Sequence, residues 1–250
     1  MSQNSDLASS RPPVALVMGA GDALGGAIAR RFARGGYVTC AVRRSEEKLQ
    51  PLIDRIAAEG GKAIAIGADA HKEDQVVALF DRIENEIGPL EVVVFNIGGN
   101  VQFGILETTA QKYFKVWEMA CFAGFLTGRE AARAMLTRGR GTILFTGATA
   151  SMRGGKGFAA FSGAKHGLRA LAQSMARELG PKNIHVAHVV IDGAIDTEFV
   201  RERFPERYAL KEADGILNPE HIAENYWFLH RQLRTAWTFE MDLRPYMETW

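Results

Sequence analysis

Residues 14–33 read VALVMGAGDALGGAIARRFA: a short apolar run, a glycine-rich turn and a segment with apolar residues at helical spacing. The run is rich in β-branched residues, which is typical of a buried strand. Glycine lets the chain turn tightly and lets a phosphate approach the backbone at the start of the helix that follows. The chain is therefore predicted to open with a dinucleotide-binding unit centred on the turn from Gly19 to Gly25.

Similar apolar runs alternate with helical segments along the rest of the chain. We expect strands at 14–18, 37–42, 63–68, 92–96, 142–147 and 184–190, and helices at 27–34, 46–59, 73–87, 110–137 and 158–179. Alternating strands and helices predict a parallel sheet, and almost wholly apolar runs are typical of strands covered on both faces. The predicted fold class is α/β, a single-domain Rossmann-type doubly wound parallel β-sheet with helices on both faces.

The expected organisation is simple, because no proline-rich or serine-rich linker interrupts the pattern. Residues 1–12 are polar and are predicted to form a disordered N-terminal tail, and 13–250 a single dinucleotide-binding domain. The charged, irregular stretch 193–217 is expected to cover a substrate.

Composition narrows the range of partners. Thirty basic and 29 acidic residues leave a net charge of +1, so no overall attraction to nucleic acid or to an anionic membrane surface is expected. No apolar run approaches the roughly 20 residues of a membrane span. Cys40 and Cys121 form neither a CxxC pair nor a disulfide framework, and no metal-ligand spacing occurs, which favours a cytoplasmic protein without a metal.

The end of the second predicted strand bears on the choice of cofactor. An acidic residue there would bind the ribose 2′-hydroxyl of NAD, whereas this chain has Val42 followed by Arg43 and Arg44. Guanidinium groups suit a 2′-phosphate, so NADP(H) is favoured over NAD(H). The alternative is that both arginines simply begin a solvated helix. Asp22 adds an unfavourable negative charge near the phosphates.

Further motifs follow in chain order. They are Asp69-Ala70, Asn96-Ile97-Gly98-Gly99, Phe161-Ser162-Gly163-Ala164-Lys165 and Asp192-Gly193-Ala194-Ile195-Asp196-Thr197. Together with the glycine turn, they resemble the signatures of the short-chain dehydrogenase/reductase family, from Val14 to about Trp237. The resemblance implies cofactor-binding positions at Gly19, Gly21, Ala23, Leu24, Gly25, Arg43, Arg44, Asp69, Ala70, Asn96, Gly98, Lys165, Gly193 and Thr197. Ala23 replaces the middle glycine of the turn, Met18 its threonine, and Asp192 a proline.

The residues at the catalytic positions differ from those that are typical of that family. The resemblance implies a tyrosine, a serine, a lysine and an asparagine, and only Lys165 is kept. Phe161 stands at the tyrosine, Ala148 at the serine and Cys121 at the asparagine. Loss of a positioned general acid costs about 10²- to 10⁴-fold in rate if nothing replaces it.

Several side chains are candidates for the missing proton donor. Thr149 lies nearest to the serine position, although a hydroxyl in such a turn more often caps the backbone. Ser151 and Ser162 are further hydroxyl candidates. His166 is expected on the surface, and Cys121 as a small buried residue. Asp192, Asp196 and Glu198 are predicted to form a solvated loop that contacts a polar or cationic substrate at most.

Three functions remain open at this point. The first is an NAD(P)-dependent oxidoreductase with an atypical active site, which transfers hydride to or from a small carbonyl or alcohol substrate. The second is a cofactor-binding sensor or inactive partner subunit without redox turnover, and the third is a lyase or isomerase reusing the pocket. The helices at 110–137 and 158–179 are apolar on more than one face, and the family resemblance implies that they pair in a homo-oligomer, a dimer or tetramer.

Overall fold

A seven-stranded, all-parallel sheet forms the centre of the protein, seen here in a computed structural model that describes residues 11–249. The strand order is β3-β2-β1-β4-β5-β6-β7. The strands are β1 (Val14–Met18), β2 (Val38–Arg43), β3 (Lys62–Gly67), β4 (Leu90–Phe95), β5 (Gly141–Thr146), β6 (Ile184–Ile191) and β7 (Glu240–Leu243). The predicted α/β class and doubly wound parallel sheet are confirmed.

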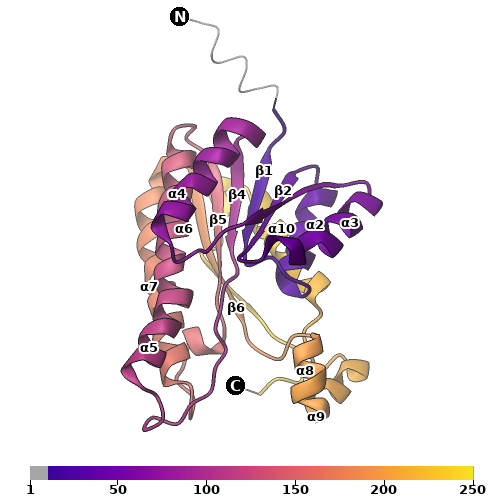
Figure 1. Cartoon of the computed structure of the whole chain (residues 1–250), viewed down its shortest axis with the longest axis vertical. Helices are drawn as coiled ribbons and strands as arrows, with labels where there is room; N and C mark the ends of the chain where they lie inside the picture. Colours follow the sequence, from indigo (N-terminus) through magenta and orange to yellow (C-terminus); the bar gives the residue numbers. More distant parts are fainter. Residues whose placement is uncertain (1–10, 250) are drawn as a thin grey trace, which may run out of the picture.

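Helices cover both faces of this sheet (Figure 1). On one face lie α4 (Glu73–Arg82), α6 (Ala123–Leu136) and α7 (Ala159–Leu179); on the other lie α2 (Leu24–Arg34), α3 (Gln50–Ala58) and α10 (Pro219–Arg231). Each face has its own buried apolar core, with Leu126 and Leu168 in the first and Phe32 and Tyr226 in the second. The strands are apolar on both sides because both sides are buried.

The strand order reverses beside β1, which pairs with β2 on one side and with β4 on the other. Crossovers from these two strands leave in opposite directions, so a crevice opens at their carboxyl ends. Ligands of open α/β sheets bind in such a crevice. The glycine turn after β1 lies there.

The predicted helix at 110–137 forms with a change of geometry in its middle. It comprises α5 (Ala110–Trp117), a π-helical segment at Glu118–Phe122 and then α6. Phe114 stacks on Trp117, Trp117 on Phe122 and Phe122 on Phe125, with ring centroids 6.0, 5.9 and 6.2 Å apart. Phe114 and Phe125 are exposed, so part of this aromatic stripe (Phe114, Trp117, Phe122 and Phe125) faces solvent.

The sequence pattern predicts no helix or strand beyond residue 193. The segment 193–217 contains α8 (Glu198–Arg203) and α9 (Pro205–Tyr208), and Ile195 pairs with Leu217 in an isolated parallel bridge. After it come α10 and the edge strand β7. Of the predicted disordered tail, residues 1–10 lie outside the described residues, whereas Arg11 donates hydrogen bonds to the carbonyls of Glu84 and Asn85 at 2.8 and 2.9 Å.

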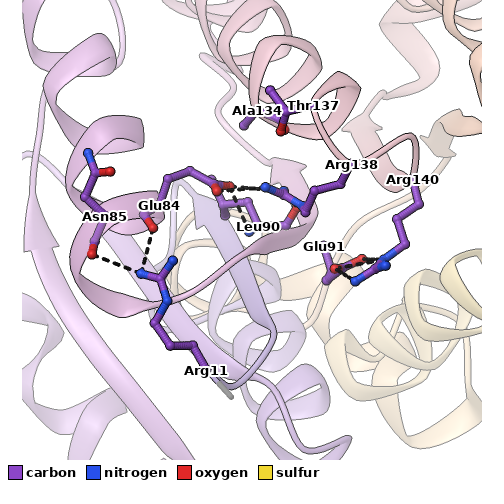
Figure 2. Close-up of polar contacts among 9 residues, drawn as sticks. All are labelled: Arg11, Glu84, Asn85, Leu90, Glu91, Ala134, Thr137, Arg138 and Arg140. Carbon is purple, nitrogen blue, oxygen red and sulfur yellow. Dashed lines mark hydrogen bonds and ion pairs between the residues drawn. The ribbon is translucent and has the colours of Figure 1, made fainter. Parts of the chain in front are cut away.

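A polar cluster lies at the amino ends of β4 and β5, opposite the crevice (Figure 2). It joins the segments that follow α4 and α6 to the sheet. Arg138 donates to both carboxylate oxygens of Glu84, at 2.7 and 3.1 Å, and to the carbonyl of Leu90 at 2.8 Å. Glu84 also accepts from the backbone N–H of Leu90 at 2.9 Å. Nearby, Arg140 pairs with Glu91 in a more exposed position.

We expect Glu84→Ala to lower the free energy of unfolding by about 2 kcal/mol, because it removes the carboxylate partner of the half-buried Arg138 guanidinium and the acceptor of the Leu90 N–H. Urea unfolding measures the change. Glu91→Ala is the matched control: its partner Arg140 is 62% exposed, so its removal should cost less than about 1 kcal/mol. Equal effects of the two substitutions would contradict the structural role given to Glu84.

Candidate active site

The glycine turn is shaped by close backbone contacts. Gly19 has φ +90°, and its N–H and that of Ala20 both donate to the carbonyl of Val42. A Cβ on Gly25 would lie 2.3 Å from the carbonyl oxygen of Gly19, so only glycine fits at the start of α2. Asn96 fixes the turn from the other side by donating its side-chain amide to the same oxygen at 3.2 Å. These contacts hold the turn against the end of β4.

A cavity of about 460 Å³ opens beside this turn, at the carboxyl ends of β1, β2 and β4. Eight of the predicted cofactor residues line it: Gly19, Gly21, Arg43, Arg44, Asp69, Ala70, Asn96 and Gly98. A Cβ on Gly21 would meet nothing within 4 Å, so the backbone is open to a ligand there. The cavity lies at the switch point of the sheet, where ligands of open α/β sheets bind, and its volume falls in the range of small-molecule sites.

The remaining predicted cofactor residues lie outside that cavity wall. Ala23 and buried Leu24 and Gly25 form the beginning of α2. Gly193 and Thr197 follow β6, and the Thr197 hydroxyl accepts from the N–H of Val200 at 3.1 Å as the N-cap of α8. Their contact with a cofactor stays a prediction.

Four cationic side chains line the cavity. Besides Arg43 and Arg44, its wall contains Lys48 and Lys115, which the motifs did not single out. His71 also lines it and lies 2.7 Å from the Asp69 carboxylate. This balance of charge suits an anionic ligand. Lys48 is close to the arginines in sequence, but Lys115 comes from α5, and only the folded chain brings it there.

Lys165 is buried between the ends of two strands. Only 3% of its surface is exposed, and its Nζ donates to the carbonyls of Thr146 at 2.8 Å and Ile97 at 3.3 Å. Burial lowers the pKa of this amine to about 8. Phe161 lies on the same face of α7, with the Lys165 Nζ 5.9 Å from its ring centroid, as their spacing predicts.

Packing brings together the side chains at the positions where the family resemblance implies a tyrosine, a serine and an asparagine. Phe161 and Cys121 belong to one buried apolar cluster, and half-buried Ala148 packs against it. Cys121 lies in the π-helical segment, and burial raises the pKa of its thiol, as expected for a small core residue. These three side chains therefore offer no group suited to donate a proton near neutral pH.

Two predictions about nearby polar residues are wrong. Asp192 is not part of a solvated loop: it is 4% exposed, because it follows directly on the fully buried strand β6. Thr149 does not cap the backbone; its hydroxyl donates to Asp192 Oδ1 at 2.5 Å, and Ser151 Oγ instead accepts from the N–H of Ala148. His166, as predicted, is exposed.

The described chain fits a nicotinamide dinucleotide. An open glycine turn, a cationic cavity and the buried Lys165 amine follow one another along the carboxyl edge of the sheet. Such a group would supply a hydride donor or acceptor. Within residues 11–249, no three His, Cys, Asp or Glu side chains gather as a metal site, and none of the helices is both long and apolar enough to span a bilayer.

Comparison with known proteins identifies the family. Residues 13–208 match the family model for short chain dehydrogenases. Versicolorin reductase 1 of Dothistroma septosporum is 36% identical over 187 residues, which cover 74% of this chain and 70% of that protein.

Solved structures agree. A short-chain dehydrogenase from Rhodopseudomonas palustris is 51% identical, with a TM-score of 0.81 over 94% of this chain and 100% of the other. A metagenomic short-chain oxidoreductase in complex with NADP is 25% identical, with a TM-score of 0.81 over 95% and 99% of the two chains. The fold thus has close counterparts among solved structures, and the chain belongs to the short-chain dehydrogenase/reductase family of oxidoreductases.

Proposed function

We propose that this protein is an NADP(H)-dependent oxidoreductase that transfers hydride between its cofactor and a small carbonyl or alcohol substrate, with an atypical active site. The observation that carries the proposal is the continuous site along the carboxyl edge of the sheet, from the cationic cavity to the buried Lys165. The similarity to versicolorin reductase 1 supports redox chemistry.

The preference for NADP(H) rests on the end of β2. Arg43 and Arg44 lie in the cavity wall with Ser45 and Lys48, where a ribose 2′-phosphate would accept charge-assisted hydrogen bonds. The carboxylates of Glu46 and Glu47 follow but are absent from the wall. The related metagenomic oxidoreductase was crystallised with NADP, which agrees with this preference.

Lys165 is the residue that we expect to hold the nicotinamide ribose. Two of its ammonium donors are used on the carbonyls of Thr146 and Ile97, which leaves a third for a ribose hydroxyl. Gly98 leaves room beside it, since a Cβ there would lie 3.4 Å from the Lys165 Nζ. Positioning of the cofactor therefore does not require the tyrosine that the family normally has.

Titration of the purified protein with NADPH and NADH, followed by cofactor fluorescence, tests binding. We expect micromolar affinity for NADPH and weaker binding of NADH. Arg43→Met with Arg44→Met should weaken NADPH binding about 100-fold and leave NADH almost unchanged, because only the phosphate loses its partners. Arg55→Met, on α3 and outside the cavity wall, is the matched control.

Equal loss of NADPH and NADH affinity in the double variant would contradict the phosphate assignment. A panel of aldehydes, ketones and alcohols with NADPH or NADP⁺ then tests turnover. Binding of NADPH without turnover on any of them would favour the second candidate, a cofactor-binding protein without redox activity. The apolar packing of Phe161, Cys121 and Ala148 is the observation that favours that candidate.

A homo-oligomer also belongs to the proposal. The exposed part of the aromatic stripe lies on α5 and α6, and Tyr113 beside it is likewise exposed. A second copy of the chain would bury this apolar surface, which a monomer leaves in water.

A further inference from the structure

A carboxylate and a hydroxyl meet next to the residue that replaces the family's serine. Thr149 follows Ala148 directly, in the turn after β5, and Asp192 is the first residue after the neighbouring strand β6. The Thr149 hydroxyl donates a hydrogen bond to Asp192 Oδ1 at 2.5 Å. The pair therefore lies at the same edge of the sheet as Lys165 and the apolar cluster.

The Asp192 carboxylate is buried, and nearby positive charges offset the cost of burying it. It is 4% exposed, its backbone N–H donates to the carbonyl of Leu243, and two guanidinium groups approach it. Arg153 lies 3.8 Å from Oδ1 and Arg244 3.8 Å from Oδ2, while Arg244 also pairs with Asp242. A buried carboxylate costs several kcal/mol unless such partners surround it.

Thr149 is the more accessible member of the pair. Its side chain is half-buried, whereas Asp192 lies behind it. A substrate that reaches half-buried Ala148 would meet the neighbouring Thr149 hydroxyl before the buried Asp192 carboxylate. The hydroxyl then stands between the substrate oxygen and the carboxylate, which is the arrangement of a two-step proton relay.

We propose that Thr149 and Asp192 form the proton relay that replaces the missing tyrosine and serine. Thr149 would be the catalytic residue that contacts the substrate oxygen, and Asp192 a positioning residue and proton acceptor that acts through it. This inference rests on the proposed hydride transfer.

The step balances in the direction of alcohol oxidation. The alcohol O–H proton passes to Thr149 Oγ while the threonine proton passes to the Asp192 carboxylate. The C–H bond of the carbinol carbon breaks, its electron pair leaves as hydride to NADP⁺, and the carbonyl double bond forms. The products are the carbonyl compound, NADPH and protonated Asp192, which returns its proton to water. Carbonyl reduction is the reverse, with the proton passing from Asp192 through Thr149 to the developing alkoxide.

Steady-state kinetics of Thr149→Val and Asp192→Asn test the relay with the substrate from the carbonyl and alcohol panel that the wild type turns over best. We expect kcat to fall about 10²- to 10⁴-fold in both variants, with NADPH affinity from fluorescence titration within about threefold of wild type. Thr149→Ser keeps the hydroxyl and should restore most of the activity. Asp54→Asn, which changes an exposed carboxylate on α3 outside the cavity wall, is the matched control and should retain wild-type kcat.

A second measurement does not depend on turnover. The infrared difference spectrum of wild type minus Asp192→Asn gives the carboxylate band of Asp192, and Thr149→Val should shift this band because it removes the hydroxyl donor. The Thr149→Ser band should stay at the wild-type position. An unshifted band in Thr149→Val would show that the hydrogen bond is not made in solution, and would overturn the relay.

The kinetic outcomes separate the relay from the proposed function. If the wild type turns over and both variants keep kcat within about threefold, the relay is wrong and hydride transfer stands. If Asp192→Asn raises KM and leaves kcat unchanged, Asp192 binds substrate and does not accept a proton, which also overturns the relay. If the wild type binds NADPH and turns over nothing, the proposed function and the relay fall together.

Discussion

Gly25→Ala is expected to lower the free energy of unfolding by about 3 kcal/mol and to weaken NADPH binding severely. Its Cβ would lie 2.3 Å from the carbonyl oxygen of Gly19, 2.9 Å from the Cα of Ala20 and 3.0 Å from the side-chain amide of Asn96. Two of these contacts are to backbone, so the turn or the helix has to move, and overpacking of this kind costs about 1–3 kcal/mol or more.

Urea unfolding and NADPH titration of the same samples measure both effects. Gly21→Ala is the matched control, since it changes a glycine of the same turn whose Cβ would meet nothing within 4 Å. We expect its stability to stay within about 1 kcal/mol of wild type. Its NADPH affinity should fall, because the new methyl group enters the cavity. Wild-type stability in Gly25→Ala would show that the turn is not packed against α2 as described.

Lys165→Met is expected to change how stability depends on pH. Burial lowers the pKa of Lys165 from 10.5 to about 8, so between these values the unfolded chain holds a proton that the folded chain has released. Stability from this group therefore rises with pH across the window, by about 3 kcal/mol in total, and is constant below and above it. Methionine has a similar shape and does not titrate.

The quantity to measure is the wild-type free energy of unfolding minus that of Lys165→Met, from pH 7 to pH 10.5. This difference should increase by about 3 kcal/mol as the pH rises through the window. Cys40, whose pKa burial raises to about 12, titrates in both proteins and cancels in the difference. A flat difference would mean that the Lys165 amine keeps its ordinary pKa and that water reaches it.

The sheet could be predicted because its strands are buried on both faces. β1 and β4 to β6 are almost wholly apolar, and no helical period competes with them. β7 was missed because it has four residues, two of them acidic, and pairs on one side only. α10 was missed because its buried residues, such as Ile222 and Tyr226, lie among charged ones after an irregular stretch.

Less of the site could be predicted. Ordered motifs located the glycine turn and Lys165, since each depends on residues close together in sequence. The burial of Asp192 depends on Arg153 and Arg244, which lie 39 and 52 positions away along the chain, and no local pattern reports such partners. A charged residue next to others looks solvated until the fold shows what covers it.

The π-helical segment at Glu118–Phe122 has a consequence for the side of the molecule on which α5 and α6 lie. In an uninterrupted α-helix, residues five positions apart differ by about 140° around the axis and cannot stack. Hydrogen bonding from i to i+5 brings Trp117 and Phe122 onto one side, with their rings 5.9 Å apart and 19° from parallel. The extra residue in the π-helical segment thus keeps the aromatic side chains of α5 and α6 on one side of the helix. A regular α-helix through the same residues would turn Phe122 and Phe125 about 100° away from Phe114 and Trp117, and would divide one continuous aromatic face into two separate halves, whereas deleting one residue from the segment would let an uninterrupted α-helix keep that face whole.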